Sequence, residues 1–112
     1  MNAEERAKYL DRPYCDKGWN GIIRLTDLLL ADIDPNYTVE QIKEKFGGLR
    51  YYASNTLQDQ EASDRFWSII RIAERLSYRI CEICGDNGEL RKEGWYRTLC
   101  DKCYANKCKG KL

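Results

Sequence analysis

The chain has 112 residues, of which 43% are hydrophobic and 33% are charged, and its formal net charge is +1. This length corresponds to one domain with at most a small module appended. The near-zero charge argues against a histone-like or polyanion-coating role. Because the chain contains no histidine, Ser-His-Asp and Cys-His catalytic pairs, HExxH protease sites and zinc fingers with His ligands are excluded.

The sequence also argues against a membrane protein. No stretch approaches the roughly 20 apolar residues that span a bilayer, and the first ten residues are polar and acidic, unlike a secretory signal. We therefore expect a cytoplasmic protein without a membrane partner.

Helices are predicted in the first third of the chain. Residues Asn2 to Asp11 favour a helix, which Pro13 ends because proline lacks an amide donor and restricts the residue before it. A second, buried helix is predicted over Ile22–Ile33, where apolar residues recur at helical spacing. The residues of this apolar stripe are Ile22, Leu25, Leu28, Leu29, Leu30 and Ile33.

The middle of the chain combines a cap pattern with a glycine pair. Thr38 followed three residues later by Gln41 matches a capping box, which predicts a short helix over Val39–Phe46. The Gly-Gly pair at 47–48 would end that helix. Leu49–Ala53 is predicted to be a strand.

A longer helix, Asp59–Arg79, is predicted to be the main scaffold, because apolar residues again recur at helical spacing. These residues are Phe66, Ile69, Ile70, Ala73, Leu76 and Ile80. Residues 1–79 are thus expected to form a helical part with one short strand.

Four cysteines form two Cys-x-x-Cys pairs, Cys81 with Cys84 and Cys100 with Cys103. This is the four-cysteine zinc pattern, because each tight turn aims two sulfurs at one point and two such turns complete a tetrahedron. All four positions around the ion are filled by thiolates, which leaves no place for water or substrate. The sequence predicts one structural Zn²⁺ ion.

The residues between the cysteine pairs favour a hairpin, with strands over Glu89–Lys92 and Trp95–Leu99. A terminal helix is predicted over Asp101–Lys107. A knuckle, a hairpin and a helix make a treble-clef-like module over residues 80–112; a zinc ribbon, with the second pair on another hairpin, is the competing topology. The predicted fold is mainly helical α+β, with the N-terminal helices and this module packed as one compact domain.

Other interpretations of the cysteines are weaker. Two disulfides suit a secreted protein, and a redox Cys-x-x-Cys normally stands as a single pair. Cys15 is either a packed small hydrophobe or a fifth candidate ligand. Cys108, in a tail with Lys107, Lys109 and Lys111, is expected to be an incidental exposed thiol.

Basic and aromatic residues alternate in two segments, and together they are the candidate binding residues. They are Lys43, Lys45, Arg50, Tyr51 and Tyr52 in the middle of the chain, and Arg91, Lys92, Trp95, Tyr96 and Arg97 on the predicted zinc hairpin. Single-stranded nucleic acids are held by this combination, since rings stack on bases and cations follow phosphates. In a strand Tyr51 and Tyr52 face opposite sides, so one belongs to the core, leaving Tyr52 as the candidate; Trp95 could instead cover the zinc module.

Several of these segments together resemble small zinc-binding proteins of bacteriophages and prophages. The matching segments are Gly18-Trp19, residues 41–52 (QIKEKFGGLRYY), CEICG from Cys81, GELRKEGWYRTLC and DKC. The resemblance implies an accessory protein that acts inside a bacterial host by binding nucleic acid or host machinery.

From these observations we expect a non-enzymatic recognition module that binds nucleic acid or a nucleoprotein complex and has no small-molecule substrate. The alternative is a protein-binding inhibitor or adaptor directed at a host bacterial enzyme or defence system, since Trp and Tyr commonly anchor protein interfaces.

Overall fold

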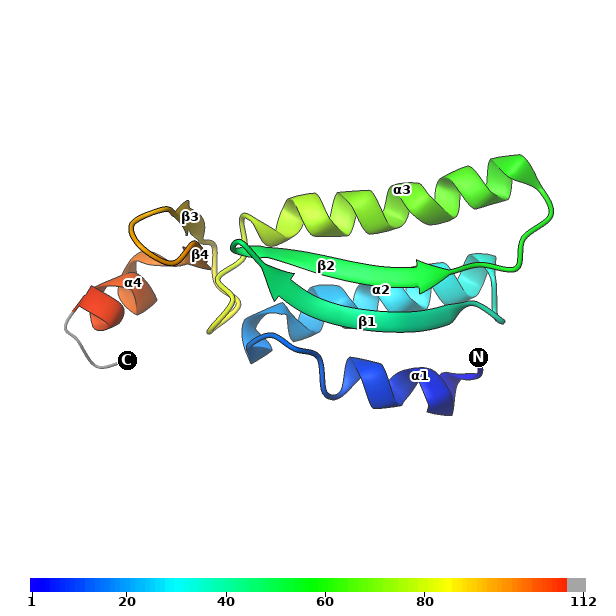
Figure 1. The fold of residues 1–112 in the computed structure, drawn as a ribbon, viewed down its shortest axis with the longest axis horizontal. Helices are drawn as coiled ribbons and strands as arrows, with labels where there is room; N and C mark the ends of the chain where they lie inside the picture. Colours follow the sequence, from blue (N-terminus) through cyan, green and yellow to red (C-terminus); the bar gives the residue numbers. More distant parts are fainter. Residues whose placement is uncertain (109–112) are drawn as a thin grey trace.

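The computed structural model describes residues 1–108 (Figure 1). The predicted basic end at Lys109 and Lys111 lies outside the described residues, as does the thiol of Cys108. The elements in chain order are α1 (Ala3–Leu10), a 3-10 turn (Lys17–Trp19), α2 (Asn20–Ile33), β1 (Thr38–Lys45), β2 (Gly48–Ser54), α3 (Gln60–Ser77), β3 (Glu89–Arg91), β4 (Arg97–Leu99) and α4 (Asp101–Cys108). The α+β fold class is therefore confirmed, as are the predicted first helix and the two long helices, α2 and α3.

The predicted helix over Val39–Phe46 is wrong, because this segment is strand β1, which pairs antiparallel with β2. The turn between them contains only Phe46 and Gly47, with φ of 55° and 83°. Positive φ at both central residues defines the type I′ turn, whose twist matches that of a hairpin. The glycine pair therefore belongs to a hairpin turn, and residues 1–79 contain two strands where one was predicted.

Neighbouring segments satisfy the backbone hydrogen-bonding groups along both edges of the β1–β2 hairpin. Side chains of α3 do so at the β2 edge, and the backbone of the loop that contains Tyr14 does so at the β1 edge. The amide of Leu49 donates to the Ser77 hydroxyl, and the amide of Tyr51 donates to a Glu74 carboxylate oxygen, both at 2.9 Å. At the β1 edge, Tyr14 forms a parallel bridge with Lys43. These partners occupy backbone groups that would otherwise attract another strand.

The main core lies between the hairpin and the two long helices, α2 and α3 (Figure 1). Its largest fully buried side chains are Trp19, Tyr37, Tyr51, Phe66, Ile23, Leu30, Ile42 and Leu49. Of the two adjacent tyrosines, Tyr51 is the core residue and Tyr52 is exposed, as strand alternation requires.

The predicted buried face of the second helix is wrong in part. Helix α2 buries Ile23, Thr26 and Leu30, whereas Leu25, Leu28 and Leu29 of the predicted stripe are exposed. The face of α2 that is turned to the core is thus rotated relative to the stripe with the most apolar residues. Packing against Trp19 and the hairpin decides which side of the helix is buried. An apolar face of α2 is left at the surface.

The cysteine module lies at one end of the molecule, beyond the hairpin turn (Figure 1), and has its own small core of Cys81, Leu99 and Cys100. Hydrogen bonds join it to the rest of the chain: Trp19 Nε1 donates to the Ile80 carbonyl at 2.9 Å, and the Gly18 amide donates to the Glu82 carbonyl at 2.8 Å.

The approach of the backbones at Gly18 explains why this position has no side chain, because a Cβ there would lie 2.1 Å from the Cys81 carbonyl oxygen.

Within residues 1–108, no helix has both the length and the hydropathy needed to cross a bilayer.

Candidate metal centre and the neighbouring surface

The sulfur atoms of Cys81, Cys84, Cys100 and Cys103 converge, each within 4.8 Å of the others. The sulfurs of Cys84 and Cys100 are 3.6 Å apart. Four sulfurs at about 2.3 Å from one ion stand about 3.8 Å from each other, whereas a disulfide joins sulfurs at about 2.05 Å. The cluster therefore has the dimensions of a site that could hold a metal ion.

The first cysteine pair lies on a tight turn. The Gly85 amide donates to the Cys81 carbonyl at 2.9 Å, and the Cys81 amide donates to the Asp86 carbonyl at 2.7 Å. Gly85 has φ of 87°, a conformation that other residues rarely adopt. This turn is the predicted knuckle.

The second pair opens a helix. Cys100 directly precedes α4, Cys103 lies in its first turn, and the Cys103 amide donates to the Cys100 sulfur at 3.4 Å. The order is therefore knuckle, hairpin and helix, as in a treble clef, and the zinc-ribbon topology is not adopted. The hairpin strands are shorter than predicted, so that residues 92–96 form a loop that carries Trp95 and Tyr96.

The crowding of four thiols shows in their ionisation. Burial raises the pKa of Cys81, but amide hydrogen bonds from Cys100, Cys84 and Ile83 outweigh burial and lower the pKa to about 7. Burial and the neighbouring thiols raise the pKa of Cys103 to about 12. The pKa of one thiol is thus lowered and that of another raised within the same cluster; a bound cation would favour the thiolate form of all four.

Cys15 lies outside this cluster. It is half-buried and packs against the main core. Burial, with a contribution from Asp16, raises the pKa of its thiol to about 12. Of the two interpretations of this residue, the structure favours the packed small hydrophobe.

All three predicted binding arginines are occupied by contacts within the chain. Arg97 bonds Glu82 at 3.0 Å and Asp16 at 2.7 Å. Arg91 donates to the Leu99 carbonyl and to Asp101. Arg50 donates to the Leu49 carbonyl and lies 3.5 Å from the Tyr78 hydroxyl. These arginines stabilise the fold, and sequence reasoning did not anticipate their partners.

The lysines of the hairpin are differently placed. Lys43 and Lys45 lie on the outward face of β1, opposite the buried Ile42. The Lys43 ammonium is 5.8 Å from the ring of Tyr52, and the Lys45 ammonium is 5.8 Å from the ring of Phe46. The outward face of the hairpin therefore presents cations beside exposed aromatic rings.

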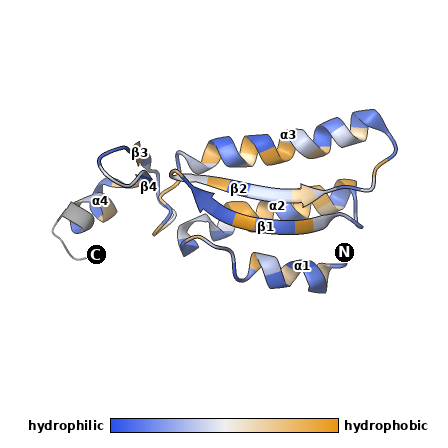
Figure 2. Cartoon of the chain, in the orientation of Figure 1, coloured by the Kyte–Doolittle hydropathy of each residue, from blue (hydrophilic) through white to orange (hydrophobic). Residues whose placement is uncertain are grey.

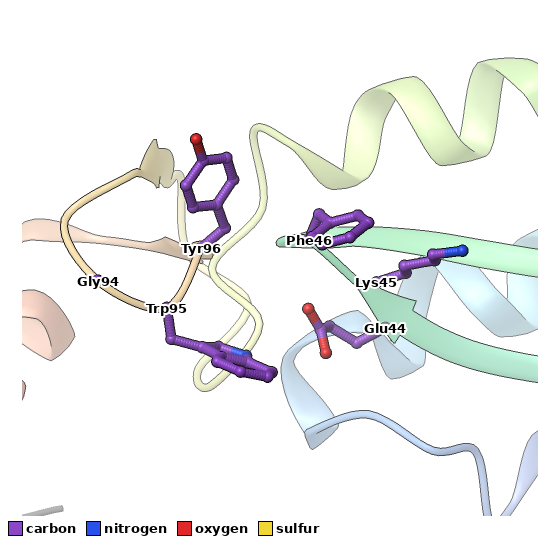
Figure 3. Close-up of a pocket in the computed structure, with 6 residues that line it drawn as sticks. All are labelled: Glu44, Lys45, Phe46, Gly94, Trp95 and Tyr96. Atoms are coloured by element: carbon purple, nitrogen blue, oxygen red, sulfur yellow. The ribbon is translucent and has the colours of Figure 1, made fainter.

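An aromatic cleft separates the hairpin turn from the loop of the cysteine module (Figure 3). The cleft has a volume of about 480 Å³ and is lined by Glu44, Lys45, Phe46, Gly94, Trp95 and Tyr96. Trp95 is 76% exposed and Phe46 is 65% exposed. Trp95 therefore does not serve as a cover for the cysteine module, which was the alternative interpretation of this residue.

The remaining candidate, Lys92, is exposed on the same loop but does not line this cleft. The sequence pattern does not indicate Phe46 as a binding residue, because it predicts a helix there; the Gly-Gly pair that follows Phe46 is the signal that could have indicated a hairpin turn. Nor does the sequence pattern indicate Glu82, whose carboxylate accepts from the Thr98 amide at 2.9 Å and binds Arg97.

Comparison of the chain with models of protein families, with curated proteins and with solved structures finds no match.

Proposed function

We propose that the protein is a non-enzymatic recognition module, held together at its C-terminal end by one structural Zn²⁺ ion, that binds single-stranded nucleic acid alone or within a nucleoprotein complex. The observation that carries the proposal is the gathering of exposed rings and lysines on the hairpin and beside the cysteine module, where neither lysine forms an ion pair within the part of the chain that the structure describes. The aromatic residues are Phe46, Tyr52, Trp95 and Tyr96, and the lysines are Lys43 and Lys45.

Zinc is the metal that best suits four thiolates in a tetrahedron. With every ligand supplied by the protein, the ion has no open position at which to activate water or polarise a substrate, so its role in this proposal is to fix the loop that carries Trp95 and Tyr96. Elemental analysis of protein purified under reducing conditions should find one zinc per chain. Protein without metal would refute this part of the proposal.

Binding of nucleic acid is measured by fluorescence anisotropy with labelled single-stranded and double-stranded oligonucleotides. We expect tighter binding to single strands than to double strands. The logarithm of the affinity should fall linearly with the logarithm of the salt concentration, because lysines displace condensed counterions, and the slope of this line is the salt slope. Trp95→Ala should weaken binding about tenfold by removing a stacking ring. Lys43→Ala and Lys45→Ala should each reduce the salt slope by about 0.7.

Lys8→Ala removes an exposed lysine of α1 that is outside the proposed binding surface; it is the matched control and should leave affinity and salt slope unchanged. Absence of binding to any oligonucleotide at low salt would reject the nucleic-acid proposal.

The second candidate is a protein-binding inhibitor or adaptor, favoured by the aromatic cleft, because Trp and Tyr dominate the binding energy of protein interfaces. The resemblance to phage proteins would make the partner a bacterial host enzyme or defence protein. Affinity purification from a bacterial lysate, with and without nuclease, separates the two candidates. A partner that survives nuclease and is lost with Trp95→Ala would favour this second function.

A further inference from the structure

Helices α2 and α3 leave an apolar groove on the surface, on the sides that do not face the hairpin. The groove is lined mainly by Ile22, Leu25, Leu29, Ile69, Ile72 and Leu76. Leu25 and Ile72 are each 54% exposed, and Leu28, on the outer side of α2, is 67% exposed. Hydrophobic residues along both helices are visible in Figure 2. Soluble monomers seldom expose such a contiguous aliphatic surface, which marks it as an interface.

Each helix carries an exposed charged residue directly beside its exposed apolar stripe, and on α3 the acidic Glu61 lies one turn beyond this residue. On α2, Asp32 follows Leu28 by four residues; on α3, Arg65 precedes Ile69 by four residues, so each charge shares the face of its stripe. Both side chains are exposed, and neither forms an ion pair with any residue of the described chain.

The two charges lie at the same end of the groove. Because α2 and α3 run in opposite directions (Figure 1), the last turn of α2 lies beside the first turns of α3. Asp32 and Arg65 thus lie on the two helices at this end of the groove, with aliphatic side chains along the rest of its length.

We propose that the occupant of this groove is a second copy of the chain, related by a two-fold axis parallel to the two helices. Such an axis lays α2 of each copy over α3 of the other while keeping the charged ends together. Asp32 of each copy then faces Arg65 of the other, and the pair occurs twice. The same operation covers Leu25, Leu28 and Ile72 of both copies, so the surface is complementary to itself in charge and in hydropathy.

The association state is measured by sedimentation equilibrium of the intact, metal-loaded protein over a range of concentrations. We expect a monomer–dimer equilibrium, and Leu28→Glu should shift it to monomer while the far-UV spectrum stays that of the folded protein, because this side chain is outside the core. A monomer at every concentration would overturn the proposal. This holds also if the groove is then found to bind a different protein.

Charge reversal tests the arrangement of the two copies. Asp32→Arg or Arg65→Asp should each weaken the dimer about tenfold or more, since two ion pairs become two like-charge contacts. The double variant should restore the wild-type dissociation constant to within about threefold. Arg71→Asp, an exposed reversal on α3 away from the groove, is the matched control and should have no effect.

A dimer that both single reversals leave intact, or that the double variant fails to restore, would overturn the two-fold arrangement.

Discussion

At the level of single residues, Arg97 and Lys92 carry the same charge in different surroundings. Arg97, a predicted nucleic-acid contact, has a side chain only 19% exposed and binds Glu82, whose side chain is 5% exposed. Lys92, assigned the same role, is exposed on a loop. A cation held by a buried carboxylate is not free to bind phosphate, so the two residues should respond differently to mutation.

We predict that Arg97→Ala lowers the free energy of unfolding by about 2–3 kcal/mol, because it leaves the Glu82 carboxylate buried without its cation. Lys92→Ala should change it by no more than about 0.5 kcal/mol. Urea denaturation of both variants, followed by circular dichroism, measures the two values. Equal stabilities would show that the ion pair contributes nothing to the fold.

A second residue-scale prediction concerns pH and the buried carboxylate of Asp34. Burial alone would raise the pKa of Asp34, but hydrogen bonds from the amides of Thr56 and Asn36, and from the Thr56 hydroxyl, outweigh burial and hold the pKa below its ordinary value of 3.8. A depressed pKa stabilises the fold above pH 3.8 and ceases to do so as the pH falls through the lower, folded-state value.

Asp34→Asn should therefore be less stable than the wild type near neutral pH, and the difference should shrink below pH 3.8. Denaturation of both proteins from pH 7 to pH 2 measures it, and any acid release of metal cancels in the comparison because the cysteines are the same. A stability difference that does not vary with pH would contradict the assignment.

At the level of elements, the hairpin β1–β2 is where local pattern and structure differ. Five of the eight residues of β1 are Glu, Gln or Lys, which are good helix formers, and Thr38 with Gln41 imitates a capping box. The segment nevertheless pairs with β2, with one irregularity in register between Val39 and Gln41. The turn holds Phe46 at φ of 55°, a conformation that costs a residue with a side chain about 1–2 kcal/mol. Such strain is typical of functional sites, and here it presents an exposed ring to the cleft.

We predict that Phe46→Asn raises the free energy of unfolding by about 1 kcal/mol, because Asn-Gly is the preferred pair in a type I′ turn. The same substitution should weaken binding of single-stranded oligonucleotides, since it removes a ring from the proposed surface. Thermal melts and anisotropy on the same preparation test both effects. Greater stability with unchanged binding would exclude Phe46 from the binding surface.

At the level of the whole molecule, two apolar cores of unequal size share one chain. The larger core, around Trp19 and Phe66, is enclosed by α2, α3 and the hairpin, whereas the module core has three buried residues, two of which are cysteines of the cluster. A core this small cannot offset the conformational entropy of its segment without another source of free energy. In the proposed function, that source is the bound metal.

We predict that chelation, or Cys84→Ser, unfolds the C-terminal third while the helices and hairpin of the larger core persist. Structural zinc contributes on the order of 10 kcal/mol to the folding of such modules. Hydrogen exchange should show lost protection in β3, β4 and α4 and retained protection in α3. Cys15→Ser, outside the cluster, is the control and should keep the metal; a melting curve unchanged by complete metal removal would contradict the prediction.

The sequence by itself determined those features that depend on neighbours along the chain. Two Cys-x-x-Cys turns orient their sulfurs locally, so the convergence of Cys81, Cys84, Cys100 and Cys103 followed from spacing, as did the positions of the two long helices, α2 and α3, from periodicity. Only the tertiary structure decided whether Thr38–Lys45 is a strand, which stripe of α2 is buried, and which cations are free. Each of these depends on a partner distant in sequence, such as β2 for β1 or Asp16 for Arg97, and no local pattern encodes such a pairing.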